Sequence, residues 1–371
     1  MKIIILGGAG AMAGVCIRDL LEFGGESIRI TAADARPVSV ADPRVHSVRV
    51  DARDIPGTAK AIQGHDVVIN CVTYYLNCEV MKAAAQARVP YIDLGGLYHG
   101  TMKQFALQED FLRAGVPAVL GMGSTPGITN VMAGALAREM DEVHEIHVRV
   151  GCYDESSYGP LPVPYALDTI LDEFSLEPMV FTHGAAVAVA PMSGKESIEF
   201  PPPVGRMEAL FTLHSEVAMF PRSFPELQES SFKVAFPPAF TQKVAFLVEL
   251  GFASREKQIR DVSPREMLIA LATSQKTEES EPRDCDALRV HVKGAQNGKV
   301  VSRTAESVIL PHPAWKIAAG SLDTGVPLSI VAQMLARKQI VEPGVLCPEK
   351  CVPPQNFFDE LIRRGITVSF Y

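Results

Sequence analysis

The glycine run near the N-terminus constrains the fold more than any other feature of this chain. An apolar segment, residues 2–6, leads directly into Gly7-Gly8-Ala9-Gly10-Ala11-Met12-Ala13. Gly8, Gly10 and Ala13 match G-x-G-x-x-G/A, in which the first glycine permits a tight turn, the second admits a pyrophosphate, and the third position allows close helix–strand packing. A helix beginning in this loop would direct its N-terminal amides at phosphates. The sequence therefore predicts a dinucleotide-binding strand–loop–helix unit; the alternative is a glycine-rich turn that binds nothing.

Short apolar runs alternate with helical patterns through the first third of the chain. We expect strands at residues 28–32, 45–50, 66–71, 90–93 and 118–120, and helices at 13–23, 58–63, 77–87 and 102–114. The strand segments are apolar on both faces, which is typical of a parallel sheet covered by helices on both sides. This pattern predicts a doubly wound α/β domain of the Rossmann type over residues 1–124.

The pattern changes near residue 125 and predicts a second, α+β domain over residues 125–311. Residues 146–150 alternate as in a half-buried strand, and Gln296-Asn297-Gly298 is a strong hairpin signal between two strands. We expect further strands at 185–189, 197–200, 288–292 and 299–307, helices at 164–174 and 239–250, and an exposed acidic loop at 276–286. The C-terminal segment, residues 312–371, contains two amphipathic helical patterns at 328–336 and 354–364.

Composition excludes several classes of partner. The 371 residues carry a net charge of −8, so a basic face for nucleic acid or an anionic membrane is not expected. No apolar run approaches the length of a membrane span. The seven cysteines form no CxxC pair, and we expect reduced thiols, no metal site and a cytoplasmic location.

Several residues are candidates for cofactor binding. Gly8, Gly10, Ala11 and Met12 would meet the pyrophosphate, and Asp34, just past the second strand, would accept from a ribose 2′-hydroxyl. A carboxylate there favours NAD over NADP, although nearby Arg36 leaves NADP possible. Ligands of open parallel sheets bind at the carboxyl ends of the strands, so the end of the fourth strand is a further candidate. The backbone there is expected to line the nicotinamide ribose, with Cys71 as a wall residue rather than a nucleophile; this stretch comprises Asn70, Cys71 and Val72.

A second set of residues could perform chemistry. Asp93 ends the fifth strand and would accept or relay a proton, as could His99; the alternatives are a turn cap and a surface residue, and Tyr98 of the same run could contact substrate. The loop from Gly123 to Asn130 offers hydroxyls and amides to a carboxylate, or is a plain hinge, and Thr129 could cap the next helix. Further along, His214 and Glu216 would point the same way on a strand and handle an amine proton, or form a surface ion pair. Other candidates are Arg206 or Arg222 as a carboxylate clamp and, more weakly, Glu173, since most acids on such a helix are solvated.

Together these residues resemble the saccharopine dehydrogenase superfamily. The matching segments are the glycine loop, Asp34, Asp93-Leu94-Gly95-Gly96, residues 121–130, the stretch from Pro203 to Glu216, and the tail from Gly344 to Leu361. Within the superfamily, length and tail most resemble the lysine 6-dehydrogenases. The resemblance implies a Rossmann domain, a catalytic domain that supplies a dimer sheet, and a C-terminal segment that packs back on the first domain. It also implies an interdomain site lined by Asp93, Thr125, Asn130, Arg206, His214 and Glu216.

The resemblance implies oxidoreductase chemistry at a carbon that carries an amine. The first hypothesis is NAD-dependent oxidation of the lysine 6-amino group to 2-aminoadipate semialdehyde, in a homodimer or larger homo-oligomer. A protonated amine releases hydride poorly, so a base is required, and Asp93 or the His214/Glu216 pair would supply it. The second hypothesis is the reverse type of reaction, a reductive condensation that forms saccharopine or carboxynorspermidine. A third, of another class, is a non-catalytic dinucleotide-binding sensor.

Overall fold

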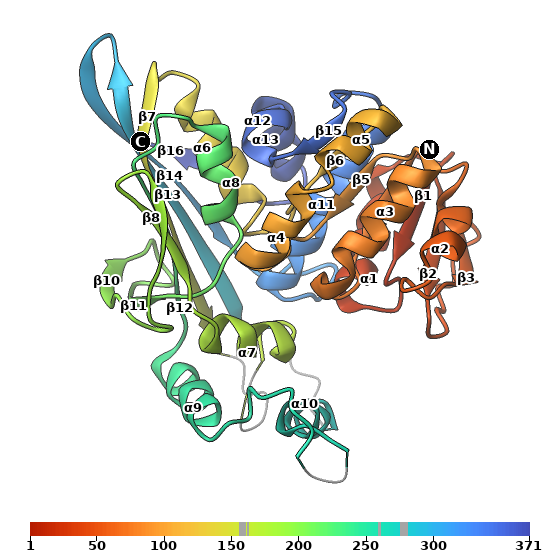
Figure 1. Ribbon diagram of the computed structural model, residues 1–371, viewed down its shortest axis with the longest axis horizontal. Helices are drawn as coiled ribbons and strands as arrows, with labels where there is room; N and C mark the ends of the chain where they lie inside the picture. The colour runs from red at the N-terminus through yellow and green to blue at the C-terminus, as the bar shows by residue number, and fades with distance from the viewer. Residues whose placement is uncertain (156–160, 162, 259–260, 275–280) are drawn as a thin grey trace.

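The computed structural model describes residues 1–155, 161, 163–258, 261–274 and 281–371. It contains two sheets, the first on the right of Figure 1 and the second on the left, with helices between them. The first sheet is parallel, in the order β15-β6-β5-β4-β1-β2-β3. Its strands are β1 (Lys2–Leu6), β2 (Arg29–Asp34), β3 (Val45–Arg49), β4 (Val67–Asn70), β5 (Tyr91–Asp93), β6 (Pro117–Val119) and β15 (Gly344–Leu346).

Helices cover both faces of the first sheet. Successive residues of β1 explain why, since Ile3 and Ile5 enter one buried cluster and Ile4 and Leu6 enter another. The first cluster includes α1 (Ala11–Phe23) and α11 (Ala319–Ala336), and the second includes α2 (Ile55–Ile62), α3 (Asn77–Ala87) and α5 (Gln108–Ala114). The predicted doubly wound α/β fold is confirmed.

The second sheet is mixed and runs in the order β10-β11-β12-β7-β13-β14-β16, with β8 and β9 added beside β12. Its strands are β7 (Glu142–Asp154), β8 (Met179–Thr182), β9 (Ala185–Ala188), β10 (Glu196–Glu199), β11 (Arg206–Phe211), β12 (Glu229–Ala235), β13 (Asp284–Gln296), β14 (Lys299–Ile309) and β16 (Ser369–Phe370). The expected hairpin joins β13 to β14, with positive φ at Asn297 and Gly298.

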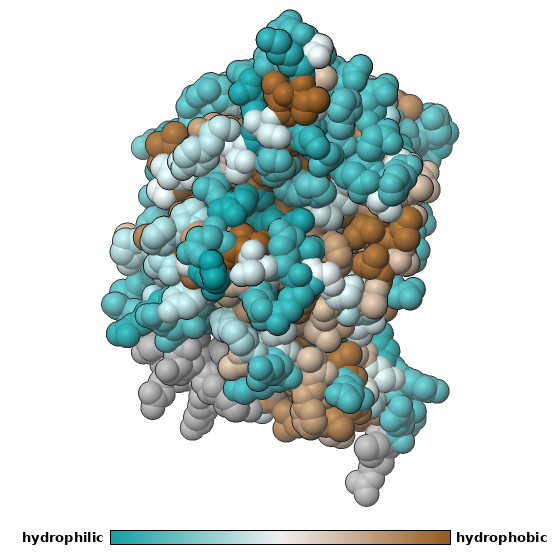
Figure 2. Space-filling model, turned by 90° about the vertical axis from the view of Figure 1, so that its left-hand side faces the viewer, coloured by the Kyte–Doolittle hydropathy of each residue, from teal (hydrophilic) through white to brown (hydrophobic). Residues whose placement is uncertain are grey.

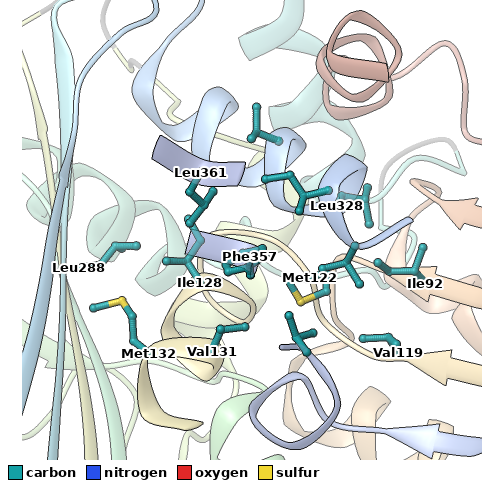
Figure 3. Close-up of a cluster of buried hydrophobic side chains, with 14 of the residues drawn as sticks. Ile92, Val119, Met122, Ile128, Val131, Met132, Leu288, Leu328, Phe357 and Leu361 are labelled. Atoms are coloured by element: carbon teal, nitrogen blue, oxygen red, sulfur yellow. The ribbon is translucent and has the colours of Figure 1, made fainter. Parts of the chain in front are cut away.

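Helices of the second domain pack on one face of this sheet and extend below it. These are α6 (Ile128–Ala137), α7 (Leu167–Ser175), α8 (Glu216–Ser223), α9 (Pro238–Glu249) and α10 (Pro264–Ser274). Figure 1 shows α9 and α10 at the lower end of the molecule. Figure 3 shows the apolar core that joins the two domains, from Ile92 and Val119 of the first sheet through α6 to Leu288 of the second.

The C-terminal segment returns to the first domain, as expected. Strand β15 pairs in parallel with β6 and extends the first sheet. Helix α11 packs against α1 so closely that a Cβ at Gly325 would lie 2.6 Å from Cγ1 of Val15. Two short helices follow, α12 (Pro348–Cys351) and α13 (Pro354–Ile362), and β16 at the end of the tail pairs with β14 of the second sheet.

The structure corrects four local expectations. The helix expected at 102–114 is two helices, α4 (Leu97–Phe105) and α5, because a tight turn at residues 106–107 lets both bury an aromatic residue. The tail holds strand β15, and α11 begins nine residues before the expected 328. The loop expected at 276–286 ends in β13, and residues 276–280 lie outside the described part of the chain. The segment around His214 and Glu216 is a loop and helix start rather than a strand, because the short apolar run that follows packs on all sides.

Candidate active site

The glycine loop has the geometry of a phosphate cradle. Gly7 has φ +79°, and a Cβ there would lie 2.6 Å from the carbonyl of Cys71, so the sharp turn is at Gly7 rather than at Gly8 as the sequence suggested. Gly10 is the N-cap of α1 and provides no side-chain cap. The first amides of an α-helix have no intrahelical acceptor, so those of Ala11 and Met12 can receive an anion. These residues therefore fit the pyrophosphate of a dinucleotide.

Asp34 lies at the end of β2 and is bonded to this loop. Its Oδ2 accepts from the amide of Ala9 at 3.1 Å, and its Oδ1 accepts from the amide of Arg36 at 2.8 Å. Burial disfavours the carboxylate, but these hydrogen bonds and the Arg36 guanidinium outweigh it and lower the pKa of Asp34. The side chain is thus an anion beside the glycine loop, suited to accept from a ribose hydroxyl.

The end of β4 lies against the same loop. The Asn70 amide donates to Asn77 at 2.8 Å and to the hydroxyl of Tyr91 at 3.0 Å, so its side chain holds the strand end in place. Burial raises the pKa of the Cys71 thiol to about 12. A neutral thiol is a poor nucleophile, so Cys71 and Val72 can offer a wall and backbone atoms at this position.

Asp93 is 1% exposed, and protein donors occupy both of its oxygens. Oδ1 accepts from the amides of Gly95 at 2.9 Å and Gly121 at 2.7 Å, and Oδ2 accepts from Tyr91 and Gln104. A carboxylate with this environment ties the end of β5 to the loop that begins the second domain. The geometry does not leave an oxygen of Asp93 free for substrate.

His214 and Glu216 form a buried pair with the threonines of the loop before α6. Nδ1 of His214 contacts Oε2 of Glu216. The other oxygen of Glu216, Oε1, accepts hydrogen bonds from the hydroxyls of Thr125 and Thr129. Burial disfavours the charged form of both side chains, but the attraction between them is stronger. The pKa of His214 is therefore raised and that of Glu216 is lowered. The side chains are 9% and 1% exposed, so this is an ion pair shielded from water rather than a surface pair.

Glu173 joins this pair from α7. The sequence suggested a solvated acid, but Glu173 is 3% exposed and accepts a hydrogen bond from the hydroxyl of Tyr165. Burial raises its pKa to about 7, although the nearby charge of His214 opposes this rise. A carboxyl group with that pKa can exchange protons near neutral pH.

Further carboxyl groups, from β13 and α11, lie near the cluster formed by His214, Glu216 and Glu173. Asp323 is fully buried and accepts from the hydroxyl of Ser124 at 2.6 Å. Burial and the nearby Asp284 raise the pKa of Asp286 to about 7, and burial and Asp286 raise the pKa of Asp323. The negative charges of Asp286, Asp323 and Glu173 all help to raise the pKa of the buried Cys152 thiol, so these three acids lie around one region.

Other candidates from the sequence lie elsewhere or have structural partners. Asn130 is fully buried, accepts from the Gly127 amide and donates to Glu349 at 2.8 Å. Arg206 is exposed on β11 and pairs with Glu199, and Arg222 stacks on Phe105, so the structure does not bring either into the cluster. Tyr98 and His99 lie in the first turn of α4 with their rings in a T-shaped, edge-to-face arrangement, and His99 is exposed.

The residues that the sequence interpretation undervalued are those whose importance depends on burial. Glu173 follows Asp172 on an amphipathic helix, and its sequence context does not distinguish it from a surface acid. Ser124 and Asp323 are 199 residues apart. Only their position in or beside the loop before α6, residues 121–127 (the Thr125 loop), identifies them as part of the site. Among the described residues, no group of three His, Cys, Asp or Glu side chains is arranged to hold a metal ion, and no helix has both the length and the hydropathy to span a membrane.

A dinucleotide cradle in one domain, together with buried acid–base groups in a second, is typical of a nicotinamide-dependent oxidoreductase. Residues 3–119 match the family model described as the saccharopine dehydrogenase NADP binding domain, and residues 123–366 match the saccharopine dehydrogenase C-terminal domain. The chain belongs to the saccharopine dehydrogenase family.

Individual relatives agree with this assignment. A protein of Synechocystis sp. named carboxyaminopropylagmatine dehydrogenase is 23% identical, with 98% of this chain and 96% of the relative covered. Carboxynorspermidine synthase of Vibrio cholerae is 23% identical, with 87% and 82% covered. In fold, the chain is similar to the apo saccharopine dehydrogenase (L-Glu forming) of Saccharomyces cerevisiae, with a TM-score of 0.77, 15% identity, and 100% and 99% of the two chains covered.

Proposed function

We propose that this enzyme joins an amine to a carbonyl compound by NAD(P)H-dependent reductive condensation, and that it catalyses the reverse oxidation of the secondary amine. The observation that carries this proposal is the buried His214–Glu216 pair beside Glu173, an acid–base set at the domain junction. The names of the Synechocystis and Vibrio relatives support it, since each denotes an enzyme of a carboxylated polyamine, and their similarity extends over most of the chain.

The charge of the site favours an amine substrate. Carboxylates from four elements gather around the Thr125 loop, and His214 is the cationic partner that the described contacts show for them. Buried carboxyl groups with few cations nearby take up protons, as the raised pKa values of Glu173, Asp286 and Asp323 indicate, or bind a cationic ligand. An ammonium or guanidinium group would supply it; the four acids are Glu173, Glu216, Asp286 and Asp323.

The chemistry assigns two proton transfers to the residues of the cluster. A protonated amine cannot attack a carbonyl, so a base first removes one proton, and Glu173 has a pKa suited to this at neutral pH. The amine nitrogen then bonds to the carbonyl carbon, and the same proton returns to the hydroxyl that leaves as water from the carbinolamine. The imine that remains carries positive charge, which Glu173, a carboxylate again once it has returned its proton, stabilises. A nicotinamide cofactor, when bound, would supply the hydride for this carbon, or accept it in the reverse direction.

The first domain provides the cofactor site. The glycine loop and the first turn of α1 would hold the pyrophosphate, and Cys71 and Val72 would line the nicotinamide half. The anionic carboxylate of Asp34 repels a 2′-phosphate, so NAD is preferred to NADP.

Oxidative deamination of the lysine 6-amino group is the second candidate. It requires the same base and the same hydride transfer, but the substrate is a primary amine, and hydrolysis of the imine releases ammonia instead of a second amine. One observation favours it: Arg206 and Arg222, the arginines expected to clamp a carboxylate, lie outside the cluster. A small substrate with few carboxylates has less need of such a clamp.

We also propose that the chain forms a homodimer through the second sheet. The face of β7 and β13 that lies opposite α6 carries His147, Arg149, Arg289 and His291, which line a hollow of about 510 Å³. Figure 2 looks onto this side of the molecule and shows a largely hydrophilic surface with apolar patches. A self-association through this face would be polar, and analytical ultracentrifugation at several salt concentrations would measure it.

Nicotinamide absorbance with purified protein tests the reaction. NADH or NADPH is combined with an aldehyde or 2-oxo acid, with agmatine or a diamine, and with both together. Oxidation of the cofactor only when both are present supports condensation. Reduction of NAD by lysine alone, with no carbonyl compound, supports deamination instead. Cofactor binding without turnover on any pair would refute both and indicate a sensor.

A further inference from the structure

Helix α7 carries two adjacent carboxylates that face different domains. Glu173 faces His214 and Tyr165 in the candidate site. Asp172, the preceding residue, is 3% exposed and contacts the first domain. A helix turns about 100° per residue, so neighbouring side chains diverge and one helix can serve both surfaces.

Two tyrosines of the first domain donate to Asp172. They belong to the short 3₁₀ helix η1 (Tyr74–Leu76), which follows directly on the Cys71–Val72 segment. The Tyr74 hydroxyl donates to Oδ2 of Asp172 at 2.7 Å, and the Tyr75 hydroxyl donates to the same oxygen. Their rings pack together with centroids 4.1 Å apart. The segment expected to line the nicotinamide is therefore linked to α7 by one carboxylate.

Two arginines of the second domain hold Asp172 ready for these donors. Arg265 is 3% exposed and donates from Nη1 to Oδ1 of Asp172 at 2.7 Å and to Asp168 at 3.0 Å. Its Nε donates to the carbonyl of Ala253 at 2.8 Å. Arg255 lies over the ring of Tyr75, 4.5 Å from its centroid, and contacts both aspartates. Because both oxygens of Asp172 are occupied, this carboxylate serves as an anchor rather than a base.

We propose that Tyr74 and Tyr75 are positioning residues, which hold α7 and with it Glu173 in register with the nicotinamide side of the first domain. Domains within one chain can move relative to each other where the contact between them is not large and apolar, and the contact between α7 and η1 is a polar one. Proton and hydride transfer require reacting groups to be held closely, so a small displacement is costly. Two hydroxyls on one buried carboxylate restrict this displacement without touching substrate. The catalytic part of this inference rests on the proposed function, whereas the link itself does not.

Removal of the two hydroxyls tests the link while the rings remain. In Tyr74→Phe/Tyr75→Phe, amide hydrogen exchange of residues 167–175 should be faster than in wild type by at least about tenfold, because a hydrogen bond to a charged group typically contributes that much or more. The control is Tyr153→Phe, which removes a tyrosine hydroxyl 2.7 Å from the carboxylate of Glu155 within the second domain. It should leave this exchange unchanged.

Kinetics separate positioning from simple stability. In the double variant, kcat should fall about tenfold. The Kd for NADH, measured by fluorescence, should stay within a factor of about two, because the glycine loop is untouched. Unchanged exchange in residues 167–175 would overturn the link. Faster exchange with unchanged kcat would overturn the positioning role, and absence of turnover in wild type would refute the proposed function while leaving the exchange result interpretable.

Discussion

The imidazole of His214 lies nearly flat on the ring of Phe232, with centroids 3.8 Å apart and planes inclined by 12°. Glu216 contacts Nδ1 at the edge of the same imidazole. The stack fixes the tilt of the ring and the carboxylate fixes its rotation, so Nε2 is the nitrogen that can face a substrate. A histidine held in this way acts as a defined donor or acceptor rather than as a mobile surface group.

We expect His214→Asn to lower kcat by roughly 10²- to 10⁴-fold, the usual contribution of a positioned acid–base group. Asparagine cannot exchange a proton, and it leaves Glu216 without its cationic partner. Steady-state kinetics with saturating cofactor measures the effect. His183→Asn is the control, since His183 is exposed and has φ +49°, which asparagine tolerates. Equal turnover in both variants would contradict the assignment.

Glu173→Gln should change how stability depends on pH. The folded pKa of about 7 lies above the usual 4.5, so the stability from the protonated carboxyl is fully present below about pH 4.5 and is lost as pH rises through about 7. Glutamine does not titrate, so across this window wild type should lose about 3 kcal/mol relative to the variant, at ~1.36 kcal/mol per pKa unit. Urea unfolding at several pH values measures it. The exposed Glu177→Gln should show no such difference, and parallel profiles for wild type and Glu173→Gln would exclude an elevated pKa.

Gly7→Ala should destabilise the fold and weaken cofactor binding. The substitution costs about 1–2 kcal/mol for the left-handed backbone, and a further ~1–3 kcal/mol because the new Cβ would lie 2.6 Å from the Cys71 carbonyl. Gly25→Ala is a matched control, with φ +84° but no atom within 4 Å of a Cβ, so it has only the first cost. Chemical unfolding and NADH fluorescence measure both effects. A Gly7→Ala protein as stable as Gly25→Ala would show that the loop does not press against β4.

Asp34→Asn should shift cofactor preference toward NADP. The substitution removes the negative charge that would repel a 2′-phosphate and releases Arg36 from its ion pair. We expect the ratio of the Kd values for NADPH and NADH to fall by about tenfold, which corresponds to about 1.4 kcal/mol. Fluorescence titration with both cofactors measures the ratio. Asp51→Asn, an exposed acid after β3, is the control, and an unchanged ratio in Asp34→Asn would argue against contact with the ribose.

Local patterns predicted the parts of the fold that depend on neighbours in sequence. The apolar strands, the glycine loop and the hairpin at Asn297-Gly298 follow from side-chain period and backbone freedom, and these are properties of short segments. His214 and Glu216 were also identified from sequence, although as a strand pair. The error concerned the element and not the contact, because residues two apart can meet in several backbone conformations.

The long-range part of the site was decided by tertiary structure. Burial turns Glu173 from an ordinary helical acid into a group with a pKa near 7, and it leaves Asp93 with no oxygen free for substrate, although both are plain acids in the sequence. Arg206, a plausible clamp from its neighbours in sequence, is exposed and pairs with Glu199 instead. By itself the sequence determined the class of fold and the cofactor cradle. Which acids have a raised pKa was decided only by the packing of distant segments, because desolvation and charge depend on what surrounds a side chain in space.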